Sequence, residues 1–137
     1  MANAVYPAYR KALLEGSGPD LTSVNVKMVI VDLADYTYSS AHDFLDDVPS
    51  GARVGTSGNL SSKTTTGGVF DAADPTITSV TGDPVEAVIV YHDTGTASTS
   101  RLLAYIDTQS DGSTPISFTP NGSNVTITIP AGGIFSL

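Results

Sequence analysis

The sequence predicts a mainly β fold, an antiparallel sandwich, jelly roll or small barrel with one or two short helices. Three observations lead to this prediction. About seven or eight short runs show the apolar alternation or β-branched content of strands. Only 15% of the 137 residues are charged, while Ser, Thr and Gly are abundant. Asp111-Gly112 and Asn121-Gly122 are dipeptides typical of hairpin turns. A chain of this length builds one core.

The first predicted element is a short helix. Pro7 suits its first turn, Gly16 suits its C-terminal stop, and the apolar residues between them share one face. Glycine, serine and proline then interrupt any regular structure. We therefore divide the chain into an N-terminal helical arm with a linker, residues 1–18, and a single β-rich domain, residues 19–137. The arm docks on a neighbouring subunit or packs on its own core, and the sequence leaves both alternatives open.

The strongest strands are predicted in three runs rich in apolar and β-branched residues: 25–31, 85–92 and 101–107. The last two should pair as an antiparallel hairpin, because a turn-forming segment joins them. Weaker strands are expected in three further segments: 59–65, 76–80 and 125–129.

A second short helix is expected over residues 39–49. Ser40 and Asp43 have the spacing of a capping box, and Pro49 would end the helix.

The two central strands are apolar on both faces. One face of an antiparallel sheet usually meets water. Either a helix or another subunit must therefore cover the second face, and both remain open.

Charge and composition exclude several classes of partner. Fourteen acidic residues against six basic ones give a formal net charge of −8, which repels nucleic acids and anionic lipids. The apolar runs are far shorter than the about 20 residues of a membrane-spanning helix. The first residues lack the pattern of a secretory signal, so we expect the protein to remain in the compartment where it is made. There is no cysteine, hence no disulfide or thiolate metal site.

The sequence contains no recognisable catalytic motif. His42 and His92 are the only histidines, and neither a nucleophile elbow nor a phosphate-binding loop occurs. We therefore predict that the protein is not an enzyme, has no catalytic residue and uses no cofactor. Paired carboxylates for glycoside hydrolysis are set aside, because so short a chain with few aromatic residues offers little platform for a sugar.

Acidic clusters were considered as calcium sites. Two groups qualify by proximity in the sequence: Asp43, Asp46 and Asp47, and Asp71 with Asp74. A solvated acidic surface is the favoured interpretation of both. No metal ligand is therefore assigned.

Three segments carry a resemblance to a known family: DYTYSSAHDFLDDVP at 35–49, GGVFDAAD at 67–74 and SRLLAYID at 100–107. They resemble a family of small structural proteins of tailed bacteriophages, and the likeness spans most of the chain. The resemblance implies a virion component and transfers no catalytic or ligand-binding residue.

Within that class, the resemblance implies a capsid decoration or cement protein, which binds the major capsid protein on the head exterior as a homotrimer. Assembly would take place in the host cytoplasm. A tail or head-fibre receptor-binding module is the alternative, and a cell-wall glycan hydrolase is a remote one.

The hypothesis for the interfaces combines arm contacts, a subunit interface and an apolar chain end. The respective residues are Tyr6, Tyr9, Leu13 and Leu14; Leu103 and Tyr105; and Ile134, Phe135 and Leu137.

Overall fold

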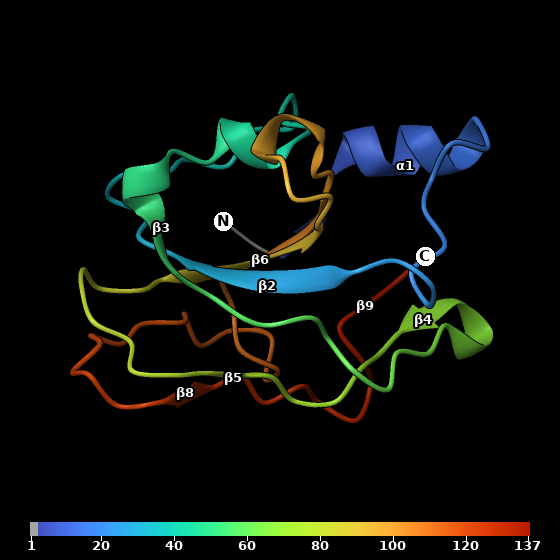
Figure 1. The fold of residues 1–137 in the computed structure, drawn as a ribbon. Helices are drawn as coiled ribbons and strands as arrows, with labels where there is room; N and C mark the ends of the chain where they lie inside the picture. The colour runs from blue at the N-terminus through green and yellow to red at the C-terminus, as the bar shows by residue number, and fades with distance from the viewer. Residues whose placement is uncertain (1–2) are drawn as a thin grey trace.

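The computed structural model describes residues 3–137; the first two residues of the predicted arm lie outside the described part. A five-stranded antiparallel sheet forms the centre of the molecule (Figure 1), in the order β1-β7-β6-β2-β3. Its strands are β1 (Ala4–Val5), β2 (Val26–Val31), β3 (Arg53–Thr56), β6 (Ala87–His92) and β7 (Leu102–Ile106). The helix α1 spans Pro7–Leu14.

Two short antiparallel ribbons complete the β structure. They are β4 (Val69–Phe70) with β9 (Phe135–Ser136), and β5 (Thr76–Ile77) with β8 (Val125–Thr126). Short 3-10 turns occur at Leu45–Asp47, Ser50–Ala52, Thr66–Gly68 and Ala97–Thr99. The prediction of a mainly β, antiparallel fold with a short helix is confirmed, and the sheets do not close into a barrel.

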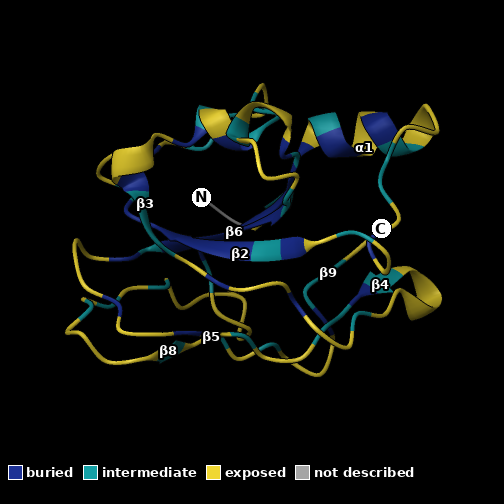
Figure 2. Cartoon of the chain, viewed as in Figure 1, coloured by how far each residue is buried: buried dark blue, intermediate teal, exposed yellow. Residues whose placement is uncertain are grey.

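The central sheet lies between two layers of the same chain. Figure 1 shows α1 and several 3-10 turns on one side, and the short ribbons with their long connections on the other. Figure 2 shows the central strands buried along most of their length, whereas the outer segments are largely exposed. Both apolar faces are thus covered within one chain, which answers the question that the sequence left open.

The register of the central strands follows from their apolar residues. In the β2–β6 pair, Val29 lies opposite Ile89 and Ile30 lies opposite Val88. All four side chains are buried, because successive residues of a strand point to opposite faces and each face meets a covering layer. The predicted hairpin between β6 and β7 is confirmed, with a register shift at Val90.

The N-terminal segment is part of this core. β1 pairs with β7, and the backbone N–H of Tyr6 donates a hydrogen bond to the Leu103 carbonyl at 3.0 Å. Tyr6 and Tyr9 are 0% and 1% exposed. The predicted helix is confirmed, and of the two alternatives for its docking, the structure shows packing on the chain's own core.

The second predicted helix, residues 39–49, is wrong apart from one 3-10 turn. The Asp47 carboxylate accepts a hydrogen bond from the Asp43 backbone N–H at 2.8 Å, which closes a tight loop instead of a helical turn. The Arg53 guanidinium donates to the carbonyls of Leu45 and Val48, both at 2.9 Å. These bonds satisfy the loop's backbone without a helical ladder.

The predicted strand at 59–65 is also wrong, because only an isolated bridge between Thr64 and Asp71 forms there. The strands expected at 76–80 and 125–129 exist, but each pairs over only two residues.

Candidate functional site

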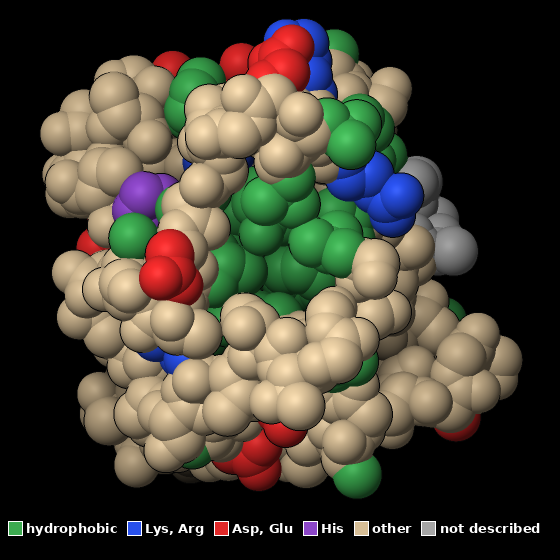
Figure 3. All heavy atoms as spheres, turned by 90° about the vertical axis from the view of Figure 1, so that its right-hand side faces the viewer, with side chains coloured by type: hydrophobic (Ala, Val, Ile, Leu, Met, Phe, Trp, Pro, Cys, Tyr) green, Lys and Arg blue, Asp and Glu red, His purple; other side chains and the backbone are tan. Residues whose placement is uncertain are grey.

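An apolar hollow lies between α1 and the β4–β9 ribbon. Figure 3 shows this side of the molecule, with hydrophobic side chains on the floor of a depression ringed largely by polar and backbone atoms. The hollow has a volume of about 230 Å³. Its lining residues are Tyr9, Leu13, Pro19, Asp20, Leu21, Thr65, Gly68, Phe70, Phe135 and Leu137.

Aromatic contacts hold the two ends of the chain together at this hollow. The ring of Phe135 lies edge-on to Tyr9, with centroids 6.2 Å apart, and tilted against Phe70 at 5.5 Å. Phe135 and Phe70 are also paired in the β4–β9 ribbon. The floor is therefore built from α1, from the middle of the chain and from its last residues.

A glycine fixes the turn that brings β9 into place. Gly133 has a φ of +87°, which side-chain-bearing residues rarely adopt, and a Cβ there would lie 2.5 Å from the Val69 Cγ1. Its N–H donates to the Pro130 carbonyl at 2.9 Å. The close approach of this turn to β4 directs Phe135 toward the floor of the hollow.

Two large hydrophobic side chains are largely exposed, one in the lining of the hollow and one at the end of α1. Leu14, which follows the lining residue Leu13 in α1, is 89% exposed, and Leu137 is 62% exposed. Lys11 and Glu15 form an exposed ion pair at 2.7 Å on the same helix. Asp20 lies at the rim, where hydrogen bonds from Thr22 and Ser23 lower the pKa of its carboxyl. The hollow thus has an apolar centre with an acidic group at its edge.

The structure divides the predicted interface residues into three groups. It brings together four of them around the hollow, Tyr9, Leu13, Phe135 and Leu137, and leaves Leu14, the residue after Leu13, exposed. Ile134 lines a different cavity, between the central sheet and the C-terminal layer. Tyr6, Leu103 and Tyr105 are at most 2% exposed in the core. The expectation that these three offer surface to a partner is corrected, because packing within the chain already buries them, and the same correction applies to Tyr9, which is 1% exposed.

A buried group of tyrosines, which the sequence analysis did not identify, lies under α1. The hydroxyls of Tyr6 and Tyr36 are 2.9 Å apart, and the Tyr36 hydroxyl is 2.9 Å from Nδ1 of His42. The ring of Tyr38 packs on Tyr6 and Tyr105 at 5.3 and 5.1 Å. These tyrosines come from segments far apart in the sequence, so no local sequence pattern predicts that their hydroxyls and rings meet.

Burial controls the chemistry of this group. It raises the pKa of Tyr36 to about 12 and that of Tyr6 further. The hydrogen bond between the two hydroxyls adds to the increase at Tyr6 and opposes it at Tyr36. Both phenols therefore stay neutral at physiological pH. With exposures of 0% and 3%, Tyr6 and Tyr36 lie out of reach of a substrate, so the group acts as a hydrogen-bonded part of the core.

Carboxylates of the acidic clusters singled out in the sequence accept hydrogen bonds from backbone N–H groups. Asp47 closes the loop described above. Asp71 accepts the N–H of Ala72 at 2.8 Å, and Asp74 accepts that of Ile129 at 2.9 Å. Elsewhere in residues 3–137, the carboxylates of Asp32, Asp35 and Asp83 lie within 4.8 Å of one another and could hold a cation. Asp32 already accepts the N–H of Ala34 at 2.8 Å.

The two histidines lie apart from each other in different settings. His42 contacts Tyr36, whereas His92 ends β6, opposite Val26. Burial lowers the pKa of His92, so this imidazole is neutral at physiological pH.

No family model and no curated protein matches the sequence. Within the described part of the chain, no helix is both long enough and apolar enough to cross a membrane.

Proposed function

We propose that the protein is a capsid decoration protein, a structural component that binds the outside of a bacteriophage head and stabilises the shell. Two arguments support the proposal. The three sequence segments at 35–49, 67–74 and 100–107 resemble small structural proteins of tailed phages. The apolar hollow, with the exposed Leu137 in its lining and the exposed Leu14 at the end of α1, offers a contact surface, and this is the observation that carries the proposal.

The size of the hollow fits a multivalent binder. Ten residues line the hollow, fewer than the about 20–30 that each side of a stable protein interface contributes. Contacts of this size become strong when several copies engage a repetitive shell together, because the second and third contacts are then intramolecular. This supports the proposal of a homotrimer that bridges copies of the major capsid protein.

The apolar character of the hollow also defines how binding should respond to salt. The chain carries a formal net charge of −8, so its long-range attraction is limited to positively charged surfaces. An apolar contact persists when salt screens charges. Capsid binding should therefore survive ionic strengths that dissociate complexes held by surface ion pairs.

The test is co-sedimentation of the purified protein with undecorated capsids of its own phage, with copies counted per particle. Saturable binding in proportion to shell subunits is expected. Leu14→Ser and Leu137→Ser should each weaken binding, and the double variant should abolish it. Thr119→Ala is the matched control, since Thr119 is exposed and lines neither this hollow nor the second cavity.

Two results would contradict the proposal. Absence of binding to capsids would remove the decoration role. A handful of copies per particle would instead identify a tail or head-fibre module, which acts at few positions.

A further inference from the structure

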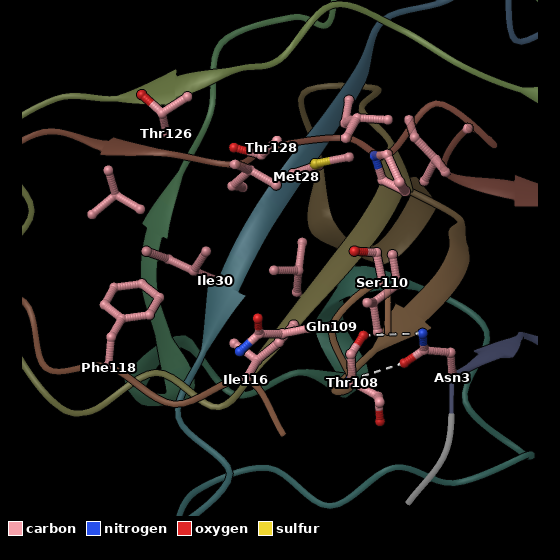
Figure 4. Close-up of a pocket in the computed structure, with 18 residues that line it drawn as sticks. Asn3, Met28, Ile30, Thr108, Gln109, Ser110, Ile116, Phe118, Thr126 and Thr128 are labelled. Atoms are coloured by element: carbon pink, nitrogen blue, oxygen red, sulfur yellow. Dashed lines mark hydrogen bonds between the residues drawn. The ribbon is translucent and has the colours of Figure 1, made fainter. Parts of the chain in front are cut away.

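A second and larger cavity, here named the inner cavity, lies between the central sheet and the C-terminal layer. Its volume is about 370 Å³, within the range of about 300–1,000 Å³ typical of small-molecule sites. Met28, Ile30 and Val88 form its floor on the sheet, and the C-terminal layer, including Phe118 and Ile127, covers it (Figure 4). This cavity is separate from the apolar hollow at α1, with which it shares no lining residue.

The inner cavity is lined without charge. None of its 18 lining residues, all within the described part of the chain, is acidic, basic or a histidine. Its polar groups are neutral side chains from the N-terminal segment, the segment after β7, and the β8 region: Asn3, Thr108, Gln109, Ser110, Thr126 and Thr128. Figure 4 shows Thr126 and Thr128 on one side and the other four grouped on another.

Hydrogen bonds order one polar end of this cavity. The Asn3 amide oxygen accepts the N–H of Thr108 at 3.0 Å, and the Asn3 amide nitrogen donates to the Thr108 carbonyl at 3.2 Å. Gln109 lies next to this pair (Figure 4), and its amide nitrogen donates to the Pro115 carbonyl at 3.4 Å. The amides of Asn3 and Gln109 thus lie at this polar end of the cavity as uncharged hydrogen-bonding groups.

Water is a poor occupant of the apolar part of this cavity. A buried water molecule needs 2–4 polar partners. The side chains of Met28, Ile30 and Val88 offer no strong hydrogen-bonding group, although these residues are only 1%, 0% and 6% exposed. Across the cavity, Phe118 and Ile127 are half-buried, so the accessible apolar surface of the cavity lies on the C-terminal layer rather than on the floor.

We propose that the inner cavity binds a small uncharged amphiphile, with its apolar body against the half-buried side chains of Ile116, Phe118 and Ile127, above the Met28–Ile30–Val88 floor, and a hydroxyl or amide head near Asn3 and Gln109. A charged head would lose hydration with no ion-pair partner in the lining, and an anion would also meet the net charge of −8. A peptide helix is too large, because one turn about 10 Å wide and 5.4 Å long fills about 420 Å³. The proposal goes beyond capsid binding and does not depend on it.

The test compares 1-octanol with octanoate, which share an apolar chain but differ in the charge of the head at neutral pH. Methyl NMR of the full chain is the readout. Octanol should shift the methyl signals of Met28, Ile30 and Val88 saturably, and leave those of Val29 and Ile89, on the opposite sheet face, in place. Octanoate should bind at least about tenfold more weakly.

Three results would overturn the proposal: no saturable shift with octanol, equal shifts on both sheet faces, or octanoate binding as tight as that of octanol. If the chain self-associates and octanol dissociates the oligomer, the inner cavity is occupied by a second copy of the chain, and this result would also overturn the proposal.

A variant that fills the inner cavity tests the location of the binding site. Val88→Phe adds a ring to the floor and should weaken octanol binding at least about tenfold, whereas Thr119→Ala, outside the cavity, should bind as the wild type does. If circular dichroism shows that Val88→Phe does not fold, Thr128→Trp at the exposed rim takes its place with the same expected loss. Wild-type affinity in the folded cavity variant would refute the assignment.

Discussion

The docking of the N-terminal helix on the core is tested by replacing Tyr6. Its side chain is fully buried, its ring packs 5.3 Å from that of Tyr38, and its hydroxyl meets that of Tyr36. A buried aromatic side chain removes about 200 Å² from water, which at about 25 cal/mol per Å² corresponds to about 5 kcal/mol. Tyr6→Ala should therefore lower the free energy of unfolding by about 4–5 kcal/mol, consistent with measured aromatic-to-alanine losses.

Two companion variants separate the causes of this loss. Tyr6→Phe removes only the hydroxyl and should cost about 1 kcal/mol, because Tyr36 keeps its contact with His42. Leu14→Ala, at an 89% exposed position of the same helix, should change stability by less than about 0.5 kcal/mol. Tyr6 makes no side-chain cap to α1, so its replacement removes no helix cap.

Urea unfolding followed by circular dichroism measures all three variants. If Tyr6→Ala costs no more than Leu14→Ala, the N-terminal segment is a detachable arm and the packing described above is wrong. Deletion of residues 1–18 should impair folding. A loss of capsid binding in that variant would therefore not show that the N-terminal segment contacts the capsid.

Three further predictions concern a turn, the tyrosines and an ion pair. Gly133→Ala should destabilise the protein by about 2 kcal/mol, because Gly133 has a positive φ and a Cβ there would collide with Val69. Gly132→Ala, where a Cβ meets open space, should be nearly neutral. Equal thermal midpoints of the two variants would contradict this. Burial raises the pKa of Tyr36 from 10.0 to about 12, so the unfolded state loses this proton at a lower pH than the folded state does. The free energy of unfolding should therefore be constant below pH 10 and decrease between pH 10 and 12, with the tyrosinate absorbance reporting the ionisation. A constant free energy of unfolding through pH 12 would refute the burial. The Lys27 ammonium lies 2.8 Å from the Asp93 carboxylate and lowers the pKa of that carboxyl. Asp93→Asn should therefore lower the free energy of unfolding by about 1 kcal/mol at neutral pH, and this difference should vanish below pH 3.8 as acid protonates the wild-type carboxylate. A difference that persists in acid would contradict the ion pair.

The sequence predicts the central strands well, because their pattern of apolar residues matches the faces that are buried in the structure. The runs at 25–31, 85–92 and 101–107 are apolar on both faces, and both faces are buried. The alternation at 125–129 correctly indicates side chains facing an apolar layer, but pairing stops after Thr126. The N–H of Ile127 instead meets the Pro75 carbonyl and that of Ile129 meets the Asp74 carboxylate.

The wrong helix at 39–49 has its origin in side chains that bond the backbone of the loop. Asp47 and Arg53 satisfy loop N–H and carbonyl groups that a helix would otherwise pair. Propensity rules do not contain such partners.

The apolar hollow could be predicted only in part. Leu13, Phe135 and Leu137 were identified as surface candidates, but their meeting depends on the pairing of β9 with β4 and on the turn at Gly133. Contacts between residues so far apart in the chain leave no periodic signal. The inner cavity depends in the same way on how closely the C-terminal layer approaches the sheet.

The most direct test of the proposed decoration role is a cryo-electron microscopy reconstruction of phage heads saturated with the protein. The account predicts density in regular array on the shell exterior, with Leu14 and Leu137 turned toward capsid protein or a neighbouring copy. Density only at the tail, or an array in which α1 and β9 face solvent, would contradict it.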